Sequence, residues 1–226
     1  NSEKKIWADY LLSHQEEDGL FRDPLMQCEI AESEDYWGWR HLTAHVVLAL
    51  TVLGVKTKTK FRCLKPLYCE NNAELWIRSL PWEEKPDFVS NTVMNYGVLL
   101  QYERDFLNSN DAKDALVLIF DYLNQSVCPK TGLWGMVGEV TNAKALSVGV
   151  QTSYHIWNLY FYENREIPHI ERAIDNCLKT QNSLGGYGVE LNSSACDDID
   201  TIDPLCRCRM MTKDRSKDIG ESLKRA

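Results

Sequence analysis

A short turn pattern recurs along this 226-residue chain and restricts the folds open to it. In each copy a glutamine ends a helix-like run, and a turn then leads to a glycine and, two residues later, an aromatic residue. The copies run from Gln15 to Phe21, from Gln125 to Trp134 and from Gln181 to Tyr187. The last two glutamines are 56 residues apart, and the first two are 110 apart, nearly twice that spacing. A recurrent period indicates that one supersecondary unit is repeated.

A further copy is expected near residue 70 or somewhat later, where the Pro-rich turn at residues 81–88 is a candidate for a degenerate form. Between the turns, apolar residues three and four apart on a charged background predict outer, half-exposed helices. More apolar runs that contain small and polar residues predict inner helices surrounded by other helices. The outer helices are expected at residues 6–12, 73–80, 115–123 and 170–178, and the inner ones at residues 37–53, 88–102, 143–162 and from a start between 193 and 204.

The sequence therefore predicts an all-α fold of about four outer–inner helical hairpins, arranged as a superhelix or a ring. We expect one such domain over residues 1–210, followed by a polar, basic segment at residues 211–226. Because the chain begins with Asn1 and ends without an obvious stop, we interpret it as a fragment or a processed form.

The charge balance bears on the partners. A formal net charge of −8 argues against nucleic acid and anionic membrane surfaces, since both reward basic proteins. No apolar run approaches the roughly eighteen residues that span a bilayer. The eight cysteines form no CxxC pair, which favours reduced thiols in the cytoplasm, with a secreted disulfide protein as the alternative. The expected partner is a small-molecule or glycan ligand, and the sequence does not indicate an oligomeric state.

The densest cluster of chemical groups is acidic: Asp197, Asp198, Asp200 and Asp203 lie within seven residues. Carboxylates crowded in this way must hold a metal, raise a pKa, accept hydrogen bonds from helix amides, or stay solvated. The structural alternative is helix capping, with Asp203 as the N-cap before Pro204 in the first turn.

Aromatic and histidine side chains on the inner helices are further candidates. Trp37, His41 and His45 recur every fourth residue and so share one helical stripe. The two histidines have metal-ligand spacing, but no third ligand is identifiable, and hydrogen-bonded histidines in a polar funnel are the favoured interpretation. His155 lies in a polar, aromatic stretch and is either a general acid or base or a satisfied core histidine. The substrate-binding candidates are Trp37, Arg40, His41, Asn91, Tyr154 and Trp157.

The turns, together with Gly185-Gly-Tyr187-Gly188 and the acidic stretch from Ser194 to Thr201, resemble the α/α toroid group. That group includes squalene–hopene cyclases, class II terpene cyclases and protein prenyltransferase subunits. The resemblance implies a toroid, here an incomplete ring, and an enzyme that acts in a central funnel. It assigns catalysis to Asp197, Asp198 and Asp200, with His155, and makes magnesium a candidate cofactor that no residue pattern requires.

The cyclases of this group use an Asp-x-Asp-Asp motif whose central acid donates a proton. Aligned on Thr201, the first and last acids match at Asp197 and Asp200, whereas Ile199 takes the central place. Two alternatives stand beside a terpene cyclase- or prenyltransferase-like enzyme. One is a carbohydrate-active toroid enzyme, because paired carboxylates with a histidine suit glycosidic chemistry and tryptophans near the turns suit sugars. The other is a non-catalytic helical-repeat protein that binds a partner.

Overall fold

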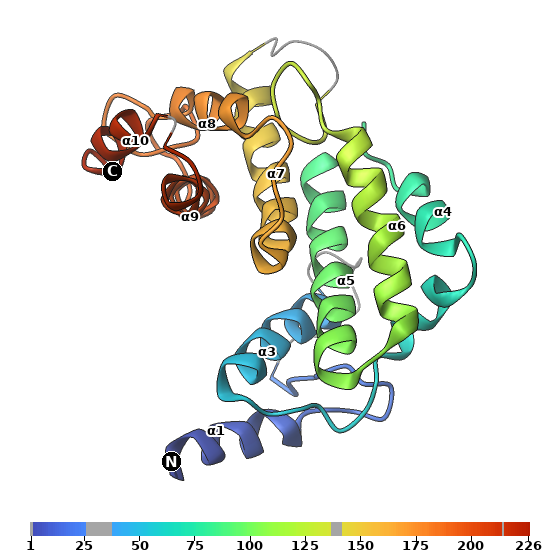
Figure 1. Cartoon of the computed structure of the whole chain (residues 1–226). Coiled ribbons are helices and arrows are strands. Elements are labelled where there is room, and N and C mark those ends of the chain that lie inside the picture. Colours follow the sequence, from blue (N-terminus) through green and yellow to red (C-terminus); the bar gives the residue numbers. More distant parts are fainter. Residues whose placement is uncertain (1, 26–37, 137–141, 214) are drawn as a thin grey trace. The chain divides into compact units, whose positions relative to one another are not determined.

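The computed structural model describes residues 2–25, 38–136, 142–213 and 215–226, and these form an all-helical fold (Figure 1). Among the described residues no extended strand is present, and an isolated antiparallel bridge joins Gln15 to Phe21. The sequence prediction of an all-α chain is therefore confirmed.

Each helix expected from the sequence corresponds to a helix of the structure. The expected outer helices are α1 (Ser2–Ser13), α4 (Asn72–Ser79), α6 (Asn110–Ser126) and α8 (Ile170–Lys179). The expected inner helices are α3 (Trp39–Leu53), α5 (Pro86–Leu107), α7 (Ala143–Glu163) and α9 (Ala195–Met211). Two further elements are the 3-10 helix η1 (Arg62–Tyr68) and α10 (Ser216–Leu223). The expected start of the first inner helix at Trp37 lies outside the described residues.

The contacts within the chain divide it into two compact units. Unit 1 comprises residues 1–80 and 92–123, and unit 2 comprises residues 81–91 and 124–226. In unit 1, α1 packs against α3, and α4 packs against η1. In unit 2, α7, α8 and α9 pack against one another, and α10 packs against α8 and α9. Helix α10, which comes from the segment expected to be a polar tail, thus belongs to unit 2.

The outer and inner helices differ in burial, as their sequence patterns predict. Helix α6 buries a stripe of residues three and four apart: Ala112, Ala115, Leu116, Ile119, Phe120 and Leu123. The charged residues of α6 lie on its other face, which is exposed to solvent. Helix α7 instead buries both apolar and small polar side chains, among them Ser147, Thr152, Ser153 and Trp157. Because those polar groups are removed from water, they need partners on neighbouring elements.

The glycine-to-aromatic turns share one hydrogen bond. In each turn the backbone N–H of the aromatic residue donates to a side-chain oxygen of the inner helix that follows. Phe21 donates to Oγ1 of Thr43 over 2.9 Å, and Trp134 donates to Oγ of Ser153 over 3.0 Å. Tyr187 donates to Oδ1 of Asp198 over 2.8 Å. The aromatic residue is thereby fixed to its inner helix in all three turns.

The glycines of these turns are also required by their geometry. Gly19, Gly132 and Gly185 have φ angles of 90°, 71° and 105°, which side chains rarely adopt. A Cβ at each would collide with a backbone carbonyl, that of Lys60, His169 or Arg225 respectively. Each turn therefore lies directly against backbone of the segment that follows the inner helix.

The glutamine part of the pattern is shared by two of the three turns. Gln15 donates to the carbonyl of Gly19, and Gln181 donates to the carbonyl of Gly185. Gln125 instead lies exposed within α6, and the carbonyl before Gly132 accepts a hydrogen bond from Asn176. Gln125 lies at the end of α6, as expected, but it does not bond to its turn as the other two glutamines do, because seven residues rather than four separate it from its glycine.

Candidate functional site

Helix α9 carries the acidic cluster, and its start is fixed by a capping box. Ser194 is the N-cap: its side chain accepts from the backbone N–H of Asp197, whose own carboxylate accepts from the backbone N–H of Ser194. Pairs of this kind satisfy two amides that a helix terminus leaves without partners. The expectation that Asp203 caps the helix is therefore wrong, because Pro204 lies inside α9 and not in its first turn.

Asp197 also connects α9 to α7. Its Oδ1 accepts from Oγ of Ser147 over 3.2 Å and from the side-chain amide of Gln151. Burial works to raise the pKa of Asp197, but the hydrogen bonds from Ser194, Ser147 and Gln151 outweigh it and hold that pKa below its usual value. Asp197 is therefore an ionised group that holds the two helices together.

Asp198 serves the neighbouring turn, since its Oδ1 is the acceptor for the N–H of Tyr187. Gly188, in the same turn, has a φ of 95° and lies so close to Asp197 that an added Cβ would stand 2.6 Å from the carboxyl carbon. The glycine-rich stretch predicted to precede the acidic motif thus allows backbone to approach two of its carboxylates. The close approach of this turn to Asp197 and Asp198 is a reason for glycine at position 188.

Asp200 differs from the other acids. It is 7% exposed and has no hydrogen-bond partner among the described residues. Burial, with a smaller contribution from the charge of Asp197, raises the pKa of Asp200 to about 7. Pro204 follows four residues later and has no N–H to donate to the carbonyl of Asp200.

Tyr154 of α7 lies beside this group. Burial raises the pKa of its hydroxyl, and the charges of Asp203 and Asp200 raise it further. Asp203 itself forms an ion pair of 2.9 Å with Arg207, whose guanidinium lies 5.1 Å from the ring centre of Phe161. Between α7 and α9 lie the ionised Asp197, the buried Asp200 and the phenol of Tyr154. The fourth acid of the cluster is used in an ion pair with Arg207.

His155 of α7 is held by a serine at the start of α5. Its Nδ1 lies 3.0 Å from Oγ of Ser90, and that hydroxyl donates to the carbonyl of Asp87. Because the serine hydrogen is used, Nδ1 of His155 must be the donor, which leaves Nε2 as the nitrogen with a lone pair. This tautomer suits an acceptor of protons at Nε2.

Two substrate-binding candidates of unit 2 lie in its interior. Trp157 is 1% exposed, and its indole N–H has no acceptor among the described residues. Asn91 is 5% exposed. Direct contact between Trp157 and a substrate would require the side chains around it to move.

The remaining predicted residues belong to unit 1. Arg40 lies 5.8 Å from the ring centre of Tyr96, and it acts against the burial that raises the pKa of Cys63 to about 11. His41 contacts Asn95 of α5 and His45 of its own helix. Trp37 lies outside the described residues. The structure thus groups Asp197, Asp198, Asp200 and Tyr154 in unit 2, and Arg40 with His41 in unit 1.

Sequence reasoning missed a buried carboxylate in unit 1. Glu103 on α5 is fully buried and accepts from the N–H of Phe61 over 2.8 Å and from the hydroxyl of Tyr68 over 2.9 Å. Its position in an apolar helical run was a usable signal, because an ionisable residue there needs dedicated partners. The two bonds fix the segment after the first turn, so the role of Glu103 is structural.

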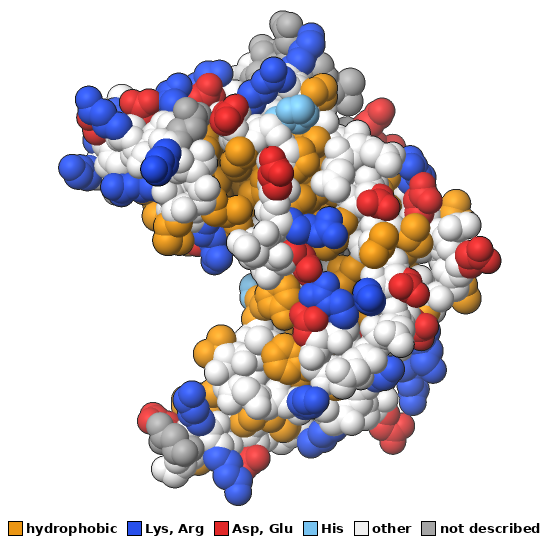
Figure 2. All heavy atoms as spheres, in the orientation of Figure 1, with side chains coloured by type: hydrophobic (Ala, Val, Ile, Leu, Met, Phe, Trp, Pro, Cys, Tyr) orange, Lys and Arg blue, Asp and Glu red, His pale blue; other side chains and the backbone are white. Residues whose placement is uncertain are grey.

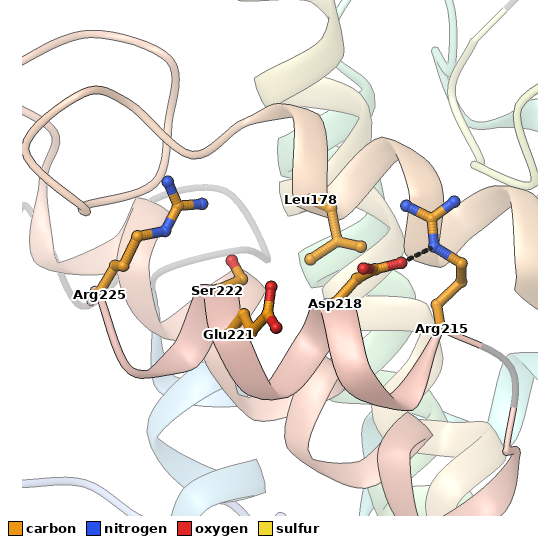
Figure 3. Close-up of a pocket in the computed structure, with 6 residues that line it drawn as sticks. All are labelled: Leu178, Arg215, Asp218, Glu221, Ser222 and Arg225. Atoms are coloured by element: carbon orange, nitrogen blue, oxygen red, sulfur yellow. Dashed lines mark ion pairs between the residues drawn. The ribbon is translucent and has the colours of Figure 1, made fainter.

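A charged pocket of about 470 Å³ between α8 and α10 was also not predicted (Figure 3). It is lined by Leu178, Arg215, Asp218, Glu221, Ser222 and Arg225. Its charges are largely used within the protein, since Arg215 pairs with Asp218 over 2.6 Å and with Asp175 over 2.8 Å. The side-chain guanidinium of Arg225 donates to Gln181. None of the predicted site residues lines it.

The acids do not form a magnesium site of the kind the toroid resemblance suggests. The oxygens of Asp197 and Asp198 accept hydrogen bonds from helix, turn and α7 donors, as described above. Across the described ranges no three His, Cys, Asp or Glu side chains come together as ligands of one ion.

Comparisons with known proteins assign no family to this chain. No protein-family model matches the chain, and neither curated proteins nor solved structures gave a match. In the part of the chain that the structure describes, every helix is too short or too polar to cross a membrane.

Proposed function

We propose that this chain is a helical-repeat enzyme of the α/α toroid type, resembling terpene cyclases and prenyltransferases, in which Asp200 transfers a proton to the substrate. The observation that carries the proposal is the environment of Asp200, a residue that is 7% exposed and whose carboxyl has no hydrogen-bond partner among the described residues. A largely buried carboxyl that makes no hydrogen bond within the described protein and has a raised pKa is a candidate functional group.

The pairing with Asp197 supports proton transfer. One acid on α9 is held ionised by several donors, whereas its neighbour one turn later is buried and has a pKa of about 7. Two carboxyl groups whose environments push their pKa values apart are the usual arrangement for separate acid and base roles. A group that titrates near neutrality is well matched to general acid catalysis at physiological pH.

The place of Asp200 in the motif also supports this assignment. In the resembling cyclases the central acid donates the proton, and Ile199 stands there in this chain. The side chain of Ile199 is 51% exposed, whereas that of Asp200 is buried. We therefore assign the donor role to the last acid of the motif, one position further along the helix.

The repeat architecture is part of the proposal. It rests on the shared hydrogen bond from the aromatic residue of each turn to the following inner helix, and on the glycines that approach the next segment. The same hydrogen bond in each of the three turns is the pattern expected when one helical hairpin is repeated along a chain.

The resemblance to the cyclases makes a hydrophobic isoprenoid the proposed substrate class. The carbohydrate alternative relied on paired carboxylates with a histidine and on tryptophans near the turns. Of these tryptophans, Trp39 and Trp82 are half-buried, and Trp134, which packs 5.6 Å from the ring of Tyr160, is 1% exposed. Trp134 is therefore unable to stack on a sugar without leaving the core.

A non-catalytic binding protein is the second candidate. It is favoured by the hydrogen bonds of Asp197 and Asp198, because these two acids are used in a helix cap and a turn and need no further role. On this account Asp200 would be a ligand-binding group alone.

The test is incubation of the purified chain with a panel of linear isoprenoid hydrocarbons and prenyl diphosphates, with products identified by gas chromatography and mass spectrometry. We expect Asp200→Asn to lower turnover by about 100-fold or more, the size typical of a lost general acid. Asp203→Asn is the matched control on the same helix, because that acid is paired with Arg207, and it should retain turnover.

Equal turnover in wild type and Asp200→Asn would contradict the role of Asp200. Saturable binding of a panel member to wild type without any product would instead favour the binding protein.

A further inference from the structure

His41 and His45 lie one turn apart on α3 with their outer ring nitrogens facing each other. The two Nε2 atoms are 3.2 Å apart, and the rings stand at 83° with their centres separated by 4.5 Å. Two imidazole nitrogens bound at about 2.0–2.1 Å to one tetrahedral ion lie roughly 3.3 Å apart. The side chains therefore already have the separation that a shared ion requires.

Asn95 on α5 fixes the orientation and the tautomer of His41. Its Oδ1 lies 3.1 Å from Nδ1 of His41, and the asparagine is fully buried. A carbonyl oxygen only accepts, so Nδ1 carries the hydrogen and the lone pair of His41 is on Nε2. Metal-binding histidines are commonly held in this way, with the second ring nitrogen donating to a carbonyl or carboxylate.

The two facing ring nitrogens share one hydrogen in the free protein. Because Nε2 of His41 carries a lone pair, Nε2 of His45 is the donor across the 3.2 Å contact, and a bound ion takes the place of that hydrogen. His45 remains exposed, so an ion can reach the pair from solvent.

We propose that His41 and His45 form a binding site for a divalent late first-row transition metal, with the remaining positions of the ion open to water or to a donor group of a small molecule. Imidazole nitrogens suit zinc, nickel and copper rather than magnesium or calcium. The site lies in unit 1 and does not depend on the proton transfer proposed for Asp200.

The experiment is calorimetric titration of the untagged protein with Ni²⁺, chosen because copper would react with the cysteines. Wild type should bind one equivalent that His41→Ala and His45→Ala each lose. His14→Ala is the control, since His14 follows α1, bonds to the Tyr10 carbonyl of that helix and should not affect binding. Asn95→Ala should weaken binding about 10- to 100-fold, as expected for a positioning residue.

Circular dichroism spectra of each variant establish that the helices remain folded, and a parallel titration with Mg²⁺ should give no heat of binding. The proposal is overturned if wild type binds no Ni²⁺, or if the isotherms of His45→Ala and wild type coincide. The second outcome would place the ion on other side chains.

Discussion

At the scale of single residues, Asp200 combines burial with the absence of a hydrogen bond among the described residues, and this has a consequence for stability. Its pKa is raised from 3.8 to about 7 in the folded chain. Between those two values the folded state keeps a proton that the unfolded state has lost. The contribution of Asp200 to stability is therefore most favourable below about pH 4, falls as the pH rises toward 7, and is constant above that.

Asp200→Asn should remove this dependence. Urea unfolding followed by tryptophan fluorescence should show that wild type loses up to about 4 kcal/mol relative to the variant between pH 4 and pH 8, at about 1.4 kcal/mol for each pH unit. The asparagine variant is thus expected to be the more stable protein at pH 8. Parallel pH profiles for the two proteins would contradict the burial of a titrating carboxyl at this position.

The sequence predicted the importance of the acidic cluster but not the division of its roles. Asp197 is ionised because Ser147 and Gln151 reach it from a helix about fifty residues earlier, and no local pattern reports such tertiary donors. Burial of Asp200 likewise depends on the packing of α9 against α7. Residue types and spacing located the cluster, whereas tertiary contacts distinguish its members.

At the scale of elements, the turns are held to the inner helices by a repeated bond from backbone to side chain. Ser153 illustrates its importance, since it is fully buried, accepts from Trp134 and donates to the carbonyl of Gly149. Without its hydroxyl the N–H of Trp134 would remain buried without a partner. The cost of that state exceeds the net value of an ordinary hydrogen bond.

We therefore expect Ser153→Ala to lower the free energy of unfolding by about 1–3 kcal/mol, measured by urea denaturation. Ser183→Ala is the control, because Ser183 is exposed in the neighbouring turn region, and it should change stability by no more than about 0.5 kcal/mol. Similar values for the two variants would show that the bond to Trp134 does not anchor the turn.

The helices were predictable because burial and periodicity are local properties. The existence of α6 and α8 follows from apolar residues three and four apart, and the turns follow from glycine and proline. The bounds of α8 were predicted to within one residue, whereas α6 extends beyond the predicted residues 115–123 at both ends. Gln125 differs from the other two glutamines for a related reason: the residue type matched, but the length of its turn did not. The backbone contacts of Gly132, and the use of Asn176 in place of a glutamine, required the structure.

At the scale of the whole molecule, the surface charge bears on the partners. Acidic and basic side chains are interspersed over the face shown in Figure 2, and the formal net charge of the chain is −8. We expect no retention on a heparin column at about 150 mM salt, where the Debye length is about 8 Å, because binding to a polyanion depends on clustered basic charge. Elution only at high salt would reveal a basic site outside this account.

The most direct test of the central claim is the titration of Asp200 itself. Carbon-13 NMR of side-chain carboxyls in aspartate-labelled protein, with Asp200→Asn for assignment, reports the protonation of this one group. The account predicts a resonance with a midpoint near pH 7 that is absent from the variant. A midpoint near pH 4 for Asp200 would mean that the carboxyl is solvated or hydrogen-bonded, and would contradict its role as a proton donor at neutral pH.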